Sequence, residues 1–375
     1  MSLSPLNFFN LLKEKKFTFF SGVPDSLLKE FNKVLLSNLS EKEHVITSNE
    51  GSAIALSTGY YLSTKKIPIV YLQNSGLGNT INPLLSLTSD SVYSIPILII
   101  IGWRGQPGVK DEPQHISQGN CMIDLLKSIN APYKILPNDI NEAKAVIDEL
   151  DISLKNLKKP HFLVVKKNTF SKYDTKIVTK DSYNLKRHII LEKIVNVFKK
   201  EIIISTTGKS SREILNYFNN NKLDKSRLFL NVGAMGHVSM IGMGIAMHSS
   251  KKIVCIDGDG SIIMHMGNLS SVGTSNLKNY IHICINNGMH QSVGIQPTNG
   301  FNINLKKIAE GCNYKFTKTI SNINEFNKVF SNIDNIEGPS FIEIRVSNKT
   351  YYDYELPRPK ISPIERKNKF MKYIN

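Results

Sequence analysis

Short apolar runs alternate with longer amphipathic segments along the first half of the chain. Continuous apolar runs that alternate with helical patterns are typical of parallel strands covered by helices on both faces. Strands are expected at 17–23, 44–48, 67–73, 95–102, 133–137 and 161–165. Helices are expected between them at 25–38, 50–63, 79–89, 117–129 and 139–155.

The second half repeats this pattern after a polar segment of mixed charge. Strands are expected at 201–208, 227–233, 252–260, 280–288 and 340–346. Helices are expected at 189–199, 210–219, 238–248, 267–274, 304–312 and 324–332. The pattern predicts two doubly wound α/β domains, residues 1–168 and 189–375, joined by a linker at 169–188. The proline-containing, basic tail from Tyr351 onward is expected to pack irregularly.

Composition changes this picture little. The chain has 375 residues, 41% hydrophobic and 21% charged, with a formal net charge of +16. The lysines are scattered, and no zinc-finger spacing, basic repeat or RNA-binding aromatic motif is present, so we expect a Lys-rich solvated surface and no nucleic-acid partner. The longest apolar stretch, 95–101, is too short to span a membrane. Four widely spaced cysteines are expected to be buried free thiols, and the protein to be cytoplasmic.

Glycine-rich and polar segments follow the predicted strands in both halves. Ligands of open α/β sheets bind beyond the carboxyl ends of the strands, so these segments are the candidates for a site. In the first half they are 21–26, 47–53 and 73–80. In the second half they are 206–211, 231–237, 258–261 and 286–292.

Asp259 stands between two glycines at the end of an apolar run. Alone, it is most simply a helix N-cap. A calcium loop of the EF-hand type is excluded, because its sixth position would be Ile262 and its twelfth Asn268. A third interpretation uses Asn287, which follows the next strand. A crossover of 25 residues separates Gly260 from Asn286, so Asp259 and Asn287 are expected at one sheet edge, where their oxygens suit Mg²⁺.

The GDG sequence at 258–260 followed by NN at 286–287 resembles the binding motif of thiamine diphosphate (ThDP) enzymes. The resemblance implies that Asp259, Asn287 and the carbonyl of Met289 hold Mg²⁺, and that Gly260 and Ser261 meet the diphosphate. In NVGAMGH (231–237), it implies that the Gly233 carbonyl receives the pyrimidine amino group. Met235 would then lie between the two rings of the cofactor.

The same resemblance implies a glutamate from the first half. Glu50, otherwise an ordinary first-turn carboxylate of a helix, would bond to the pyrimidine N1′. Gly76, Asn79, Gly208 and Lys209 are expected to contact the cofactor as well. In this family the cofactor lies between the two domain types, pyrimidine-binding (N-terminal) and diphosphate-binding (C-terminal), normally from two subunits. The resemblance therefore implies a homo-oligomer, at least a dimer.

The short linker leaves no room for the middle domain that many ThDP enzymes carry. This layout resembles that of the phosphonopyruvate decarboxylases and the related sulfopyruvate decarboxylases. The resemblance extends to segments such as GVPDSLL, GVKDEPQHISQG and STTGKSSREI. GIQPT at 294–298 departs from the GGQPT expected there. The resemblance implies decarboxylation of an anionic 2-oxo acid, phosphonopyruvate in the first case.

Asp25 and His115 match the positions that handle protons in related decarboxylases. Both are expected in loops beyond strand ends, where Asp25 is alternatively a helix cap and His115 a surface histidine. An unperturbed histidine titrates near neutrality, which suits a proton shuttle. The phosphonate needs cations, and the sequence does not rank the candidates Arg104, Lys110, Lys209 and Arg212.

Three alternatives remain at this stage. A sulfopyruvate decarboxylase would use the same cofactor on a sulfonate. A carboligase would join the decarboxylated substrate to a second aldehyde. The third is a basic anion- or nucleic-acid-binding protein without ThDP-dependent activity.

Overall fold

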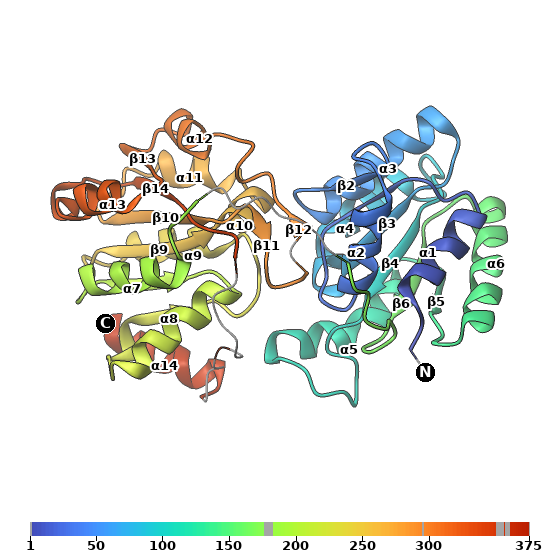
Figure 1. The fold of residues 1–375 in the computed structure, drawn as a ribbon, viewed down its shortest axis with the longest axis horizontal. Coiled ribbons are helices and arrows are strands. Elements are labelled where there is room, and N and C mark those ends of the chain that lie inside the picture. Colours follow the sequence, from blue (N-terminus) through green and yellow to red (C-terminus); the bar gives the residue numbers. More distant parts are fainter. Residues whose placement is uncertain (1, 176–182, 295, 350–355, 357–360, 375) are drawn as a thin grey trace. The chain divides into compact units, whose positions relative to one another are not determined.

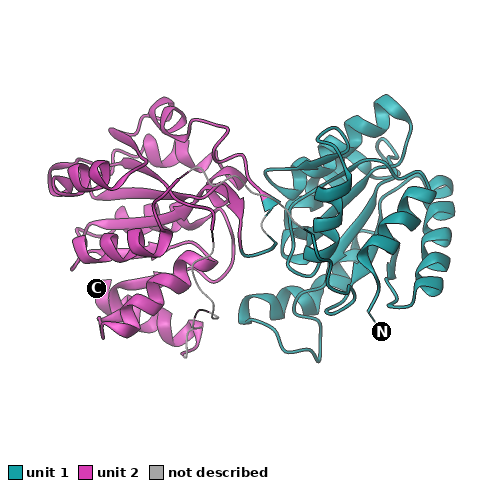
Figure 2. Ribbon diagram, viewed as in Figure 1, with its two compact units in different colours: residues 1–178, 292–296 teal, residues 179–291, 297–375 magenta. Residues whose placement is uncertain are grey.

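The computed structural model describes residues 2–175, 183–294, 296–349, 356 and 361–374 (Figure 1). The chain divides into two compact units (Figure 2). The first unit contains residues 1–178 and 292–296, and the second contains 179–291 and 297–375. Each unit has one six-stranded sheet flanked by helices. The prediction of two α/β domains without a middle domain is confirmed.

The sheet of the first unit has the order β2-β1-β3-β4-β6-β5, and its strand pairs are parallel. Its central strand β4 is fully buried, as expected for an apolar run covered on both faces. The strands are β1 (Phe20–Gly22), β2 (His44–Ile46), β3 (Ile69–Gln73), β4 (Leu98–Gly102), β5 (Tyr133–Ile135) and β6 (His161–Val165).

Most helices of the first unit match the predicted ranges within a few residues. The exception is α1, which the sequence analysis missed. Ser4 caps it by accepting a hydrogen bond from the Asn7 amide at 3.3 Å, and Pro5 occupies its first position. The helices are α1 (Pro5–Glu14), α2 (Lys29–Asn38), α3 (Glu50–Thr64), η1 (Asn74–Gly76), α4 (Leu77–Pro83), η2 (Leu84–Thr88), α5 (Pro113–Ser128) and α6 (Ile140–Leu157).

The sheet of the second unit has the order β13-β14-β10-β9-β7-β8, again with parallel pairs. Strands β9 and β10 are neighbours, as the crossover predicts. Strand β13 was not predicted, because this edge strand has half-exposed residues and no continuous apolar run. The strands are β7 (Ile202–Ser205), β8 (Leu228–Leu230), β9 (Ile253–Gly258), β10 (Tyr280–Asn286), β13 (Phe316–Ile320) and β14 (Ser340–Arg345), with short β11 (Met289–His290) and β12 (Gln296–Pro297) after β10.

The chain ends in a helix, so the prediction of an irregular tail is wrong for residues 363–374. Pro363 occupies the first helical position, where its missing N–H costs nothing. Phe370 is buried, with its ring 5.3 Å from that of Phe229. The helices of this unit are α7 (Arg187–Val197), α8 (Lys209–Asn220), η3 (Lys225–Arg227), α9 (Val238–Ala246), α10 (Asp259–Met264), α11 (Asn268–Gly273), α12 (Leu305–Gly311), α13 (Ile323–Phe330), η4 (Ile333–Asn335) and α14 (Pro363–Ile374).

The predicted linker at 169–188 lies partly outside the described residues, at 176–182. Its beginning packs on the first unit. The Leu3 amide donates to the Thr169 carbonyl at 2.8 Å, and Phe170 stacks on Phe31 with ring centroids 5.8 Å apart.

The expectation of four buried thiols is wrong in part. Cys255 and Cys284 lie on the central strands β9 and β10 and are buried. Cys121 lies on the solvent side of α5 and is exposed, and Cys312 is half-buried at the end of α12. Among the described residues, no helix combines the length and apolar character needed to cross a membrane.

Candidate active site

Glu50 is the first residue of α3, directly after β2 at the carboxyl edge of the first sheet. Asn49 caps the helix by accepting a hydrogen bond from the Ser52 amide at 2.9 Å. The Glu50 side chain is only 5% exposed. Burial raises its pKa, while the hydrogen bond from Asn79 opposes the rise. The carboxyl group is therefore biased toward its protonated form.

Gly76 and Asn79, both predicted to contact the cofactor, lie against Glu50. The Asn79 side-chain amide donates to Oε2 of Glu50 at 2.7 Å. A Cβ atom at position 76 would lie 2.1 Å from Oε1 of Glu50, so only glycine leaves room for the carboxyl group there. These two residues thus fix the position of Glu50.

Asp25 follows β1 at the same sheet edge and is fully buried. Its Oδ2 accepts a hydrogen bond from the Leu27 amide at 3.2 Å. A Cβ atom at Gly102 would lie 1.9 Å from Oδ2, so the carboxyl group packs directly on the end of β4. Burial raises the pKa of Asp25 to about 7, against the opposing charge of Arg104. Asp25 therefore changes its protonation state near neutral pH.

Arg104 forms hydrogen bonds both with Ser26, the neighbour of Asp25, and with Asp111. Its Nε and Nη2 atoms donate to the two oxygens of Asp111, at 2.8 and 2.5 Å. Its Nη1 atom donates to Ser26 Oγ at 2.6 Å. Although burial works against the charge of Asp111, Arg104 and the Gly105 amide hold its pKa at about 2. Arg104 was a candidate from the sequence, but Asp111 was not, because their pairing depends on the turn at Gly105, where φ is +68°.

His115 differs from its prediction in two ways. It lies in the first turn of α5, which Pro113 begins earlier than expected, and it is buried. Burial and the charge of Arg104 lower its pKa to about 4, against Asp111, so the imidazole is neutral at pH 7. The expectation of titration near neutrality is wrong for His115 and fits Asp25 instead. The buried Nδ1 atom of His115 has no hydrogen-bond partner among the described residues.

In the second unit, the Asp259 carboxylate, the Asn287 side-chain amide and the Met289 carbonyl converge at the adjacent ends of β9 and β10. The Asn287 side-chain amide lies 3.3 Å from Asp259 Oδ1 and 3.0 Å from the carbonyl oxygen of Met289. The Asn287 backbone amide also donates to Asp259 Oδ1, at 3.4 Å. All three residues are buried, and burial raises the pKa of Asp259 to about 6 despite the hydrogen bond from Thr298.

This convergence fits a small cation. With its NH₂ group turned inward, the Asn287 amide donates to both neighbouring oxygens. With its oxygen turned inward, the three groups offer a cation three oxygen ligands. Adjacent ligands of an octahedral Mg²⁺ at 2.0–2.1 Å are about 2.9 Å apart. The amide lies 3.0 and 3.3 Å from the two oxygens, close to that value. The donor set of these three residues thus fits Mg²⁺.

Two further residues at this position were missed. Thr298 Oγ1 donates a hydrogen bond to Oδ2 of Asp259. A Cβ atom at Gly300 would lie 2.4 Å from the same oxygen. Nothing in the sequence pattern of segment 294–298 shows that the chain returns to Asp259 there.

The predicted diphosphate residues follow β7 and β9. Ser261 is buried, and its hydroxyl oxygen accepts hydrogen bonds from the Gly236 amide at 3.0 Å and from Thr206 at 3.2 Å. A Cβ atom at Gly260 would lie 2.8 Å from the His290 ring. Gly208 has φ of +103° and precedes Lys209, the first residue of α8. Burial, followed by the charge of Arg187, lowers the pKa of Lys209.

Gly233 and Met235 lie in the loop after β8. Ala234 between them has φ of +46°, and Gly236 has φ of +88°, so the loop turns sharply at the sheet edge. The Gly236 amide bonds to Ser261, which places this loop beside the segment after β9. Met235 is half-buried. The structure thus brings the predicted residues of 231–237 and 258–261 together.

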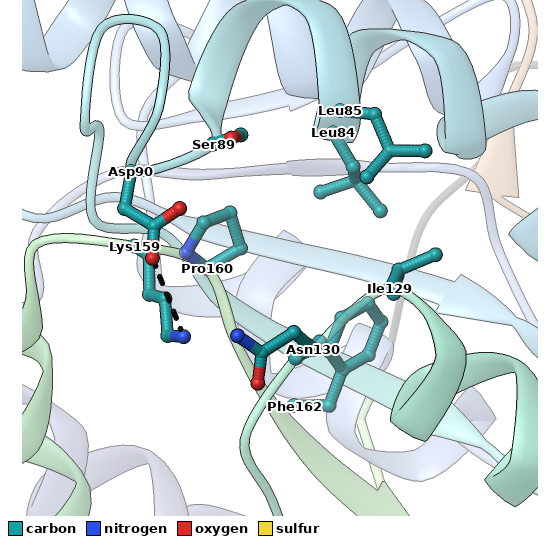
Figure 3. Close-up of a pocket in the computed structure, with 10 residues that line it drawn as sticks. Leu84, Leu85, Ser89, Asp90, Ile129, Asn130, Lys159, Pro160 and Phe162 are labelled. Atoms are coloured by element: carbon teal, nitrogen blue, oxygen red, sulfur yellow. Dashed lines mark ion pairs between the residues drawn. The ribbon is translucent and has the colours of Figure 1, made fainter.

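The pocket in Figure 3 is a different feature, at the opposite edge of the first sheet. Its residues precede strands β4, β5 and β6, and Lys159 and Asp90 form an ion pair of 3.5 Å there. Ligands of open parallel sheets bind at the carboxyl edge. The Figure 3 pocket contains none of the predicted site residues.

Comparison with known protein families agrees with this arrangement. Residues 7–127 match the N-terminal TPP binding domain of thiamine pyrophosphate enzymes, and residues 206–344 match their C-terminal TPP binding domain. Thiamine pyrophosphate is another name for ThDP. Together with the relatives below, these matches show that the chain belongs to the ThDP-dependent decarboxylases, which are carboxy-lyases.

Within that class, the chain is similar to phosphonopyruvate decarboxylases. That of Streptomyces viridochromogenes is 30% identical over 94% of this chain and 90% of its own length. The phosphonopyruvate decarboxylase of Streptomyces hygroscopicus is 28% identical over 94% of this chain and 89% of its own length. The beta subunit of sulfopyruvate decarboxylase from Methanocaldococcus jannaschii is 40% identical over 50% of this chain and 97% of that subunit.

Proposed function

We propose that the protein decarboxylates 3-phosphonopyruvate to phosphonoacetaldehyde and CO₂, with ThDP and Mg²⁺, as a step in the biosynthesis of phosphonates of the 2-aminoethylphosphonate type. The observation that carries the proposal is the convergence of the Asp259 carboxylate, the Asn287 side-chain amide and the Met289 carbonyl in a chain of this family. The choice of substrate is supported by the two Streptomyces relatives, whose similarity extends over nearly the whole chain.

In this proposal, Asp259, Asn287 and the Met289 carbonyl hold Mg²⁺. The residues assigned to the ThDP diphosphate and thiazolium side all belong to the second unit. They are Gly208, Lys209, Gly233, Met235, Gly260 and Ser261. The residues assigned to the pyrimidine side, Glu50, Gly76 and Asn79, belong to the first unit.

When bound, ThDP supplies the carbanion that adds to the keto carbon and the electron sink for the pair that CO₂ leaves behind. Glu50 holds the proton that activates the pyrimidine. Because Oε2 accepts the Asn79 amide, the proton resides on Oε1, the oxygen over Gly76. Burial raises the pKa of Glu50, which favours this protonated form.

Asp25 and His115 manage the protons that follow CO₂ release. Asp25, with its pKa raised to about 7 by burial, gives a proton to the substrate carbon or takes one from solvent near neutrality. His115 is neutral and accepts or donates at its imidazole nitrogens. The Arg104–Asp111 pair lies between their two segments and keeps a positive charge near both.

Arg104 is also our candidate ligand for the substrate phosphonate. Within the described part of the chain, Asp111 and Ser26 use three of the five N–H groups of its guanidinium. The bidentate pair fixes the orientation of the remaining donors, and an oriented guanidinium suits a tetrahedral oxyanion. Lys110 is exposed and lacks this orientation.

The functional protein is a homo-oligomer, at least a dimer, in this proposal. Helix α3 and the neighbouring η2 carry the exposed apolar side chains Leu56, Leu62 and Leu85, with Leu62 66% exposed. These exposed apolar side chains are our candidates for part of the surface that associates. We also propose that the protein acts in the cytoplasm.

The test is a side-by-side assay of purified protein with ThDP and Mg²⁺. Phosphonopyruvate and sulfopyruvate are each supplied, and CO₂ and the aldehyde are measured. We expect release of CO₂ from phosphonopyruvate with much the larger kcat/KM. A preference for sulfopyruvate would support the second candidate, sulfopyruvate decarboxylase, which the 40% identity to the beta subunit favours. Turnover of neither acid would contradict both substrate assignments.

A further inference from the structure

Thr298 and Gly300 enclose one oxygen of the Asp259 carboxylate. The Thr298 hydroxyl accepts a hydrogen bond from the Gly300 amide at 3.1 Å. Its single proton is directed to Oδ2 of Asp259. Gly300 approaches so closely that a Cβ atom there would lie 2.4 Å from Oδ2 and 2.6 Å from the side-chain oxygen of Asn286. One side of the carboxylate is therefore fully occupied.

The other oxygen of Asp259 faces Asn287. Oδ1 lies 3.3 Å from the Asn287 side-chain amide and accepts a hydrogen bond from the Asn287 backbone amide. The two oxygens of one carboxylate thus have different surroundings. Oδ2 is fixed by Thr298, and Oδ1 faces Asn287.

A buried network holds the Thr298–Gly300 segment in place. The Thr298 amide donates to the Gly288 carbonyl at 2.9 Å, which ties the segment to the loop after β10. The Asn286 side chain donates to the Gly300 carbonyl and to Glu343 Oε1, both at 2.7 Å. Glu343 is fully buried on β14. The segment is therefore anchored to two strands of the sheet.

We infer that Thr298 and Gly300 are positioning residues that orient Asp259 as a one-oxygen ligand of the metal. This inference rests on the metal site of the proposed function. Mg²⁺ demands near-ideal octahedral geometry, so a carboxylate free to rotate or to bind through both oxygens would present the wrong set of ligands. Residues that hold metal ligands typically change metal affinity by about 10- to 100-fold when removed.

The experiment measures Mn²⁺ affinity of the full-length protein with saturating ThDP, by electron paramagnetic resonance of the free ion. Thr298→Val keeps the shape of threonine and removes the hydroxyl, and Thr298→Ser restores the hydroxyl. Thr317→Val is the matched control, because Thr317 also donates to a carboxylate, Glu310 at 2.8 Å, on the edge strand β13. Gly300→Ala tests the close approach.

We expect about 10- to 100-fold weaker binding for Thr298→Val and Gly300→Ala, with near wild-type binding for Thr298→Ser and Thr317→Val. Wild-type affinity in Thr298→Val would overturn the inference. So would equal losses in Thr298→Val and Thr298→Ser, or in Thr298→Val and Thr317→Val. Equal Mn²⁺ affinity of the wild type and Asp259→Ala would instead overturn the metal site itself, and with it the proposed function.

Discussion

The side-chain amide of Asn79 donates a hydrogen bond of 2.7 Å to Oε2 of Glu50. This contact favours the ionised carboxylate, whereas burial favours the neutral acid. The net effect is a raised pKa, so burial outweighs the hydrogen bond. The pair therefore sets how firmly Glu50 holds its proton.

Replacement of Glu50 by glutamine should leave the protein folded and able to bind ThDP. The amide cannot deliver the proton of the acid, so turnover should fall by about 10²- to 10⁴-fold. Hydrogen–deuterium exchange at C2 of the bound cofactor measures the step directly, with Glu43→Gln as the exposed control. Wild-type exchange in Glu50→Gln would show that this carboxyl group has another role.

Replacement of Asn79 by alanine should raise the pKa of Glu50 further, because the hydrogen bond that lowers it is lost. If protonated Glu50 is the working form, activity declines as the pH rises through its pKa. The alkaline limb of kcat/KM should therefore move to higher pH in Asn79→Ala. Asn82→Ala, one turn further along α4, is the control. A limb that moves to lower pH would contradict the assignment.

Asp259→Ala and Asn287→Ala should each lose most activity at ordinary Mg²⁺ concentrations, since each removes one oxygen from a near-octahedral set. Excess Mg²⁺ should restore activity only weakly. Turnover is measured across a Mg²⁺ titration, with Asp124→Ala, at the exposed surface of α5, as the control. Full activity of either variant without added metal would exclude these ligands.

Asp25→Asn should change how stability depends on pH. The pKa of Asp25 is raised from 3.8 to about 7, so the folded state binds the proton more tightly than the unfolded state. The free energy of unfolding contributed by Asp25 therefore falls as the pH rises from about 4 to about 7. The variant should gain stability relative to wild type over this range, by at most about 4 kcal/mol.

Urea unfolding of both proteins at several pH values measures this difference. The comparison is needed because the lowered pKa values of His44, His115 and His290 act in the opposite sense in both proteins. A difference between the two proteins that does not vary with pH would show that Asp25 is not buried as a titrating group.

His115→Ala should reduce turnover strongly while ThDP affinity and C2 exchange stay near wild type. The reason is that His115 lies beside the Arg104–Gly105 segment and is not an expected metal ligand. Rapid quench followed by NMR of the bound species shows which step slows. Failure through loss of ThDP alone would make His115 a structural residue.

The sequence was sufficient to predict features that depend on a single strand and the turn after it. Asp259 and Asn287 follow neighbouring strands whose apolar runs are plain, and Glu50 begins a helix after a third. The sequence was not sufficient to predict contacts made by segments without a periodic apolar pattern. Thr298 meets Asp259 across 39 positions, through a loop whose path depends on the packing of Asn286 and Glu343.

Two helices begin at prolines, Pro113 and Pro363, ahead of the periodic apolar pattern or without one. The expected helix began only at residue 117, which left His115 in a loop. Its burial and altered pKa could not be foreseen, because they depend on Arg104 and on tertiary packing.

The side-chain amide of Asn287, with its NH₂ group inward, donates to Asp259 Oδ1 and to the Met289 carbonyl. One side chain therefore holds the other two proposed ligands together without any ion. In the proposed metal site the same amide would present its oxygen instead, so binding of Mg²⁺ would exchange two hydrogen bonds for one metal bond. Asn287 would thus contribute to the order of this sheet edge in the metal-free protein as well as in the loaded one.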